Sequence, residues 1–168
     1  TVWATRTASV GISDTWQKID LLLDAGADVN AADKKGRTAL MAAVRSGGGT
    51  LEETKRLPVL KVLLDNGADL NAQSHRGRTA LMNAAFRGLK ETFKFLMDNG
   101  ADFSLKDNSG CTALMYATQG CFWSYRRSGY ISVIRCLLDA GADYSVKDSQ
   151  GRTALKIAQL NRRKDIIN

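Results

Sequence analysis

The chain has 168 residues, of which 44% are hydrophobic and 24% charged, with a formal net charge of +7. This length suits one domain of ordinary size, and the composition is sufficient for a continuous core. No stretch approaches the roughly 18–20 apolar residues of a membrane span, so we expect no membrane contact. The basic balance permits acidic partners or nucleic acid and specifies neither.

The cysteines and the single histidine argue against a metal centre. Cys111, Cys121 and Cys136 have no CxxC spacing, and only His75 is available to complete a zinc site. An odd cysteine count fits a reducing compartment, and residues 1–10 do not resemble a signal peptide. We therefore expect a cytoplasmic protein without metal or cofactor, although a secreted effector acting in a host cell stays open.

The first predicted element is a helix from Lys18 to Asp24, which Gly26 ends. A Gly-Arg-Thr-Ala-Leu-Met motif follows at residues 36–41 and introduces the next helix. The motif returns with small changes, and its first glycine stands at positions 36, 77, 110 and 151, at intervals of 41, 33 and 41. The glycine of a second motif, Gly-Ala-Asp, keeps the same intervals from position 26. Two motifs in one register indicate a repeat of 33 residues, with eight extra residues in alternate units.

The unit that begins near residue 74 shows how the pattern forms a helix pair. Thr79 is a good N-cap, and Leu81, Ala84 and Ala85 lie at the spacing of one apolar helix face. Gly88 is expected to end this first helix, because glycine tolerates the left-handed conformation that follows many helices. A second helix then presents an apolar side and ends near a further glycine, with inner residues Phe93, Leu96 and Met97 before Gly100.

One such helix pair cannot bury its apolar face alone, whereas stacked pairs form a solenoid. The Asp-x-x-Gly segments between pairs, such as 107–110, predict tight turns. The whole pattern resembles the ankyrin repeat, with Thr-Ala-Leu-Met where that family usually has Thr-Pro-Leu-His. The resemblance implies an all-α ankyrin-repeat solenoid of helix-turn-helix units with β-turn or hairpin fingers. We predict a single domain, with a partial repeat at 1–32, complete repeats at 33–73, 74–106 and 107–147, and a partial repeat at 148–168.

The resemblance also implies a function, since ankyrin stacks bind partner proteins and do not usually catalyse reactions. The Thr-Ala-Leu-Met variant is similar to ankyrin proteins from bacteria, including ones that act on host proteins or neutralise toxins. We expect a monomer that binds a protein with an acidic surface through the turn tips, the residue before the capping threonine and the end of the first helix. The alternative is a merely solvated charged face. The expected contacts are Lys34, Lys35, His75 and Arg76 at the tips; Arg37, Arg78 and Arg152 before the threonine; and Arg45, Phe86 and Arg87 at the helix ends.

Two insertions between the helices of a unit distinguish this chain, at residues 47–54 and 121–128. The first has a glycine run and then residues that suit a helical extension up to Pro58. The second is aromatic and basic, which is the composition of an interface hot spot. Packing of its aromatic rings against the neighbouring unit is the alternative. The expected contacts here are Phe122, Trp123, Tyr125, Arg126 and Arg127, with Tyr116 and Tyr130 nearby.

No catalytic constellation or phosphate-binding loop accompanies the repeats. Three hypotheses follow, of which a non-catalytic protein-binding scaffold is the first. The second is the recruitment module of a larger enzyme or effector, since the ends of the chain resemble those of a fragment. The third is nucleic-acid binding through the basic face and the aromatic insertion, for which one short loop is a weak signal.

Overall fold

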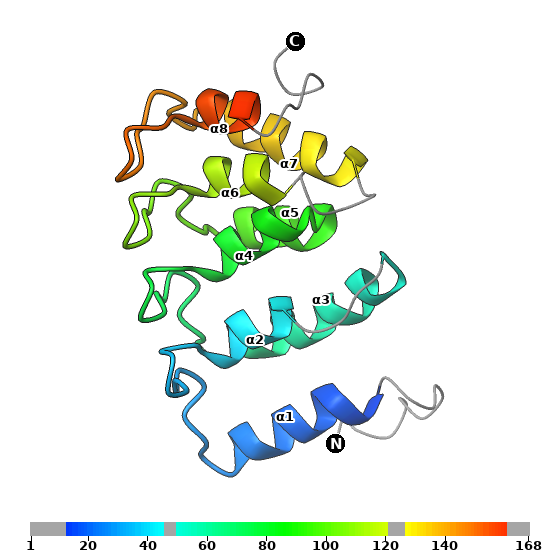
Figure 1. Ribbon diagram of the computed structural model, residues 1–168. Coiled ribbons are helices and arrows are strands. Elements are labelled where there is room, and N and C mark those ends of the chain that lie inside the picture. The colour runs from blue at the N-terminus through cyan, green and yellow to red at the C-terminus, as the bar shows by residue number, and fades with distance from the viewer. Residues whose placement is uncertain (1–12, 46–49, 121–126, 161–168) are drawn as a thin grey trace.

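The computed structural model describes residues 13–45, 50–120 and 127–160, and these ranges fold into helices and turns with no strand (Figure 1). The expectation of an all-α architecture is therefore confirmed for the described residues. The helices are α1 (Ser13–Asp24), α2 (Ala39–Arg45), α3 (Thr50–Asp65), α4 (Ala80–Arg87), α5 (Lys90–Asp98), α6 (Ala113–Gly120), α7 (Arg127–Asp139) and α8 (Ala154–Leu160).

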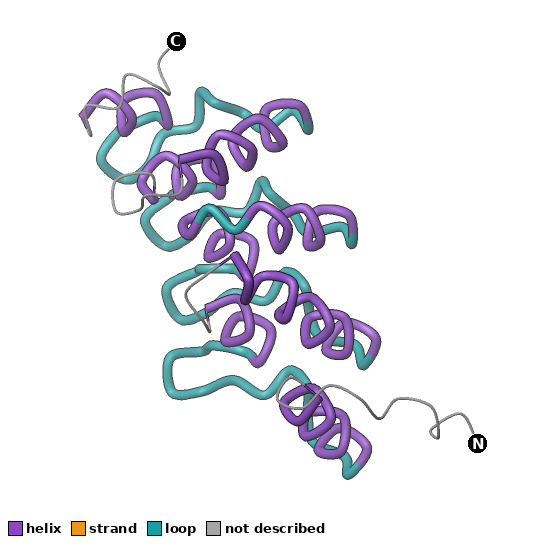
Figure 2. Tube along the Cα trace, turned by 90° about the vertical axis from the view of Figure 1, so that its right-hand side faces the viewer, coloured by secondary structure: helices purple, strands orange, loops and turns teal. Residues whose placement is uncertain are grey.

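The helices form two stacked columns (Figure 2). In one column α2 packs on α4, α4 on α6 and α6 on α8, and in the other α1 packs on α3, α3 on α5 and α5 on α7. Within each pair, α2 also contacts α3, α4 contacts α5, and α6 contacts α7. The turns before α2, α4, α6 and α8 extend to one side of the stack (Figure 1). This arrangement is the solenoid that the sequence predicts.

The short helices of the first column begin at the threonines that the sequence marks as caps. The backbone N–H of Met82 donates to Thr79 Oγ1 at 3.2 Å, and that of Lys156 donates to Thr153 Oγ1 at 3.2 Å. Gly88 ends α4 with a φ of 63°, in the left-handed region where a side chain would be strained. Both predicted boundaries of α4 are therefore confirmed.

Three helices of the second column, α1, α3 and α7, are longer than α5, which has nine residues. Helix α1 begins at Ser13, five residues before the predicted Lys18. Helix α3 begins at Thr50, so residues of the first insertion lengthen it and Pro58 falls inside it. Pro58 corresponds in the repeat to Glu91, which lies in the first turn of α5, where the missing N–H of a proline is harmless. The insertion thus extends the helix backwards past a proline that suits a helix start.

The exposure of the repeated leucines changes where a neighbouring helix pair is missing at an end of the stack. Leu63 and Leu96 are 1% and 0% exposed, whereas the equivalent Leu22 in the first described helix is 62% exposed. In the other column Leu81 is 1% exposed, whereas the equivalent Leu155 in the last described helix is 52% exposed. A pair therefore buries its leucines against the next pair, as expected for a quasi-linear stack. Over the described residues, no helix is long and apolar enough to cross a membrane.

Candidate binding surface

Each turn that precedes a first-column helix is a narrow hairpin, which we call a finger; the four fingers are residues 33–37, 74–78, 107–111 and 148–152. In the first finger the N–H of Asp33 donates to the carbonyl of Arg37 at 3.0 Å, and the N–H of Gly36 donates to the carbonyl of Asp33 at 2.8 Å. The same two bonds recur in the other three fingers. The predicted hairpin fingers are therefore present, although each is too short to count as a strand.

Backbone hydrogen bonds join each finger to the next. The N–H of His75 donates to the carbonyl of Lys35 at 3.0 Å, and the N–H of Asn108 donates to the carbonyl of Arg76 at 3.1 Å. The approach is so close that a Cβ on Gly36, whose φ is +69°, would lie 2.5 Å from the His75 ring. The fourth finger is joined by a bond from Ser149 to the carbonyl of Ser109 at 2.8 Å. The tips therefore form one connected edge with a fixed spacing.

Charge is uneven along this edge. The tips of the first two fingers carry the predicted contacts Lys34, Lys35, His75 and Arg76, and all four are exposed. The tips of the third and fourth fingers are exposed and uncharged, with Asn108, Ser109, Ser149 and Gln150.

Arg37 and Arg152 are held inside their own fingers. Arg37 Nε donates to Asp33 Oδ2 at 2.7 Å, and this bond to the guanidinium holds the pKa of Asp33 well below its usual value. Arg152 Nε donates to Asp148 Oδ2 at 2.8 Å. Burial opposes the charged form of Asp148, but the hydrogen bonds from Arg152 outweigh it and lower its pKa. Two predicted contact arginines therefore already have a carboxylate partner.

Arg78 occupies the same position of the repeat in a different environment. Position 74, which corresponds to Asp33 and Asp148, is a serine, and Ser74 Oγ accepts the backbone N–H of Arg78 at 3.2 Å. The guanidinium lies over the ring of Tyr116, with 4.8 Å between its carbon and the ring centroid. Arg78 Nε is buried and has no hydrogen-bond acceptor among the described residues.

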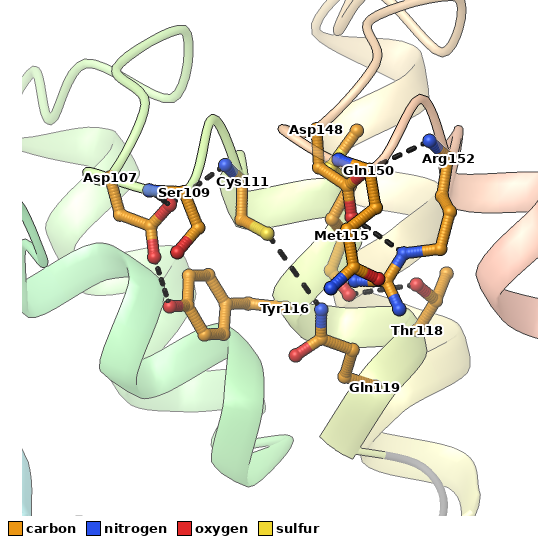
Figure 3. Close-up of polar contacts among 10 residues, drawn as sticks. All are labelled: Asp107, Ser109, Cys111, Met115, Tyr116, Thr118, Gln119, Asp148, Gln150 and Arg152. Atoms are coloured by element: carbon orange, nitrogen blue, oxygen red, sulfur yellow. Dashed lines mark hydrogen bonds and ion pairs between the residues drawn. The ribbon is translucent and has the colours of Figure 1, made fainter.

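The third finger has no arginine at this position, and its carboxylate pairs with a tyrosine. Figure 3 shows Asp107 accepting the Tyr116 hydroxyl, at 2.6 Å, while Asp148 binds Arg152 in the next finger. Burial and the bond to Asp107 raise the pKa of Tyr116, against the opposing charge of Arg78. Cys111 stands at the arginine position, where burial and then the charges of Asp107 and Asp148 raise its pKa. Its thiol therefore stays protonated.

The predicted contacts at the helix ends have different degrees of exposure. Arg45 is exposed at the end of α2, and Arg87 Nη1 donates to its carbonyl at 2.9 Å. Phe86 is half-buried against Tyr116, edge to face at a centroid distance of 6.1 Å. A Cβ on Gly120 would lie 1.9 Å from the Phe86 carbonyl oxygen, so the end of α6 contacts this backbone directly. Phe86 is therefore partly a packing residue.

The aromatic insertion lies mostly outside the described residues, which applies to Phe122, Trp123, Tyr125, Arg126 and the side chain of Arg127. The two flanking tyrosines, Tyr116 and Tyr130, are described and are buried. Tyr116 and Tyr130 are each 2% exposed, and the Tyr130 hydroxyl donates to the Phe86 carbonyl at 3.2 Å. Both rings fill the space between neighbouring helices, while the choice between contact and packing for Phe122 and Trp123 lies outside the described residues.

One buried cation is missed by sequence reasoning. Arg56, in the extended part of α3, is 5% exposed. Its Nε donates to the Ala43 carbonyl at 3.0 Å and its Nη1 to Thr92 Oγ1 at 3.4 Å, so it links α2, α3 and α5. A charged residue next to a glycine-rich insertion gives no sequence signal of burial. Across the described residues, no group of three or more His, Cys, Asp or Glu side chains is arranged to hold a metal.

Comparison with known families agrees with this geometry. A family model described as ankyrin repeats in three copies matches residues 7–74 and 50–126, and an ankyrin-repeat model matches residues 109–149. We found no significant match among curated proteins. Ankyrin repeats are generally protein–protein interaction modules. The matched ranges span most of the sequence and include the stacked pairs α2–α3, α4–α5 and α6–α7, and the chain therefore belongs to the ankyrin-repeat family.

Proposed function

We propose that the chain is a non-catalytic scaffold that binds a protein partner with acidic side chains. The contact surface that we propose is the pair of basic fingers, which we define as residues 33–37 and 74–78. The ends of α2 and α4, with the exposed Arg45 and the half-buried Arg87, extend this surface along the first column.

The observation that carries this proposal is the charge of the finger tips. Lys34, Lys35, His75 and Arg76 are exposed together on two joined fingers. The only carboxylate in these two fingers is Asp33, which is already paired with Arg37. An acidic partner therefore meets cations at this edge without competing carboxylates from the fingers themselves.

The rigidity of the edge supports the proposal as well. The backbone hydrogen bond between His75 and Lys35 fixes the spacing of the two tips. The backbone therefore loses little conformational entropy when a partner binds. A clustered charge also accelerates association and makes it sensitive to salt.

Charge reversal tests the proposal. The partner is captured on the immobilised chain, identified by mass spectrometry, produced separately and titrated by calorimetry. The test variant replaces Lys34, Lys35 and Arg76 with glutamate, and the control variant replaces Lys18, Lys61 and Lys94, which are exposed on α1, α3 and α5. The two variants change the net charge equally.

We expect the finger variant to weaken binding about tenfold or more, because several charges are reversed at the contact. The control variant is expected to bind with nearly the original affinity. Equal loss in both variants indicates a general charge effect and contradicts the proposal. Salt-sensitive binding of a mixed oligonucleotide that is lost in the finger variant, with no protein partner captured, replaces it with nucleic-acid binding.

A further inference from the structure

The three arginines before the capping threonines differ in whether a carboxylate is already bound to them. Arg37 and Arg152 each donate from Nε to an aspartate four residues earlier in the same finger. Arg78 has Ser74 in that place, and within the described part of the chain its guanidinium has no hydrogen-bonding or ion-pair partner.

Arg78 is nevertheless held in position. Its guanidinium lies 4.8 Å from the centroid of the Tyr116 ring, which is favourable for a cation over an aromatic face. Tyr116 is itself fixed, because its hydroxyl donates to Asp107 Oδ2 at 2.6 Å. A guanidinium that is already ordered loses little side-chain freedom when it takes a ligand.

Asp107 does not supply the missing acceptor. Its Oδ1 accepts the backbone N–H groups of Ser109 and Cys111 at 2.9 and 2.8 Å, and its Oδ2 accepts the Tyr116 hydroxyl. The carboxylate is therefore occupied by its own unit. Tyr116 contacts both groups, since its hydroxyl donates to Asp107 and its ring lies under the Arg78 guanidinium.

We infer that Arg78 is the anchor that receives a glutamate or aspartate side chain of the partner, an inference that rests on the proposed function. Its Nε is buried but the side chain as a whole is only half-buried, so the incoming carboxylate is expected at the terminal nitrogens. An arginine that is ordered, half-buried and without an internal acceptor has the properties of an interface hot spot. Arg37 and Arg152 lack the last property, so they contribute less to specificity.

The chain itself offers a substitution that tests this role. Ser74→Asp places at the second finger the carboxylate that the first and fourth fingers contain, and Asp33 and Asp148 show that the hairpin accommodates it. The matched control is Ser109→Asp, which adds the same charge at the exposed tip of the third finger.

The probe is a capped Glu-Gly-Glu-Gly-Glu peptide, with its glutamine counterpart as the neutral reference. Binding is followed by NMR of protein carrying ¹⁵N-arginine and ¹⁵N-histidine. Spectra are recorded at mildly acidic pH, where exchange of arginine Hε protons with water is slow enough for their observation. We expect the glutamate peptide to shift the Arg78 Hε signal, the glutamine peptide to leave it unchanged, and Ser74→Asp to weaken binding about tenfold. Ser109→Asp is expected to weaken binding about twofold at most.

Two results overturn the inference. In one, the glutamate peptide shifts the His75 signal but not the Arg78 signal, and Ser74→Asp binds like the parent protein. The partner then contacts the basic fingers without using Arg78, and the proposed function stands. In the other, neither signal shifts, which counts against the basic fingers as well.

Discussion

Asn71, in the turn after α3, reaches the turn that follows α5, where its Oδ1 accepts the backbone N–H of Asp102 at 2.8 Å. Asn30 bridges the preceding pair of turns in the same way, with its Oδ1 accepting the N–H of Asp69 at 2.7 Å. At the next equivalent position, Ser104 donates from Oγ to Asp102 of its own turn at 2.6 Å. The asparagines therefore connect successive helix pairs, whereas the serine bonds locally.

The variant Asn71→Ser tests the contribution of this bridge. The shorter side chain does not reach Asp102 and instead bonds within its own turn, as Ser104 does. We expect the free energy of unfolding to fall by about 1 kcal/mol, measured by urea denaturation, because one hydrogen bond between pairs is lost. The reciprocal variant Ser104→Asn should not be destabilising. Equal losses in both variants would mean that the turn, rather than the bridge, responds to the substitution.

Removing the Tyr116 hydroxyl leaves the buried Asp107 Oδ2 without its donor. We therefore expect Tyr116→Phe to lower the free energy of unfolding by about 1–3 kcal/mol at neutral pH. Tyr144→Phe is the control, because that ring is 71% exposed. A near-zero effect at position 116 would show that water or another donor replaces the hydroxyl.

The same pair of variants predicts a pH dependence. The pKa of Tyr116 is raised from its ordinary value of 10, so the folded protein retains this proton at a pH where the unfolded chain has lost it. The contribution of the protonated Tyr116 hydroxyl to the free energy of unfolding is complete below pH 10. It is lost as the pH rises from there towards the raised pKa of Tyr116 in the folded protein. Chemical denaturation at several pH values should therefore show a steeper alkaline loss in the parent protein than in Tyr116→Phe. Parallel curves would contradict the burial of an ionisable hydroxyl at this position.

Gly77 and Gly151 have nearly the same positive φ but differ in how much space a side chain would have. Substituting each therefore distinguishes the cost of backbone strain from the cost of a steric clash. Gly77 and Gly151 have φ values of +73° and +70°, but a Cβ on Gly77 would lie 2.7 Å from the Asn108 nitrogen, whereas a Cβ on Gly151 meets nothing within 4 Å. We expect Gly151→Ala to cost about 1–2 kcal/mol from the left-handed conformation alone. Gly77→Ala should cost clearly more, because the junction between the second and third fingers must open. Similar urea midpoints for both variants would show that the fingers separate readily.

Arg56 links three helices from a buried position, which predicts a large effect of its removal. Arg56→Ala leaves the Ala43 carbonyl without this donor, so we expect a loss of about 2–4 kcal/mol in the free energy of unfolding. Lys61→Ala is the control on the same helix, because Lys61 is exposed. Comparable small losses for both would indicate that water satisfies the acceptors of Arg56.

Much of the fold can be predicted from the sequence because the same cap, glycine and apolar positions recur in successive units. Thr79 caps α4, Gly88 ends it, and Leu81, Ala84 and Ala85 are at most 1% exposed, as their spacing predicts. The start of α1 is less predictable, since residues before Lys18 carry the repeat motif only in a degenerate form.

The binding surface is harder to predict because one repeat position has several environments. Arg37 and Arg78 both precede a capping threonine, but their partners depend on residue 33 or 74 and on a ring from the following helix pair. The residue four positions earlier is visible in the sequence. The position of the Tyr116 ring is not visible in the sequence, because the neighbouring aromatic residues suggest a surface loop. In the stack of helices the ring lies in the core.

Lysine reactivity in the complex tests the basic fingers most directly. The chain is acetylated briefly with and without its partner, and the modification of each lysine is measured by mass spectrometry. We expect the partner to protect Lys34 and Lys35 and to leave Lys61 and Lys94, on the second column, as reactive as before. Protection of Lys61 and Lys94 with Lys34 and Lys35 unchanged would place the partner on the other column and contradict recognition through the fingers.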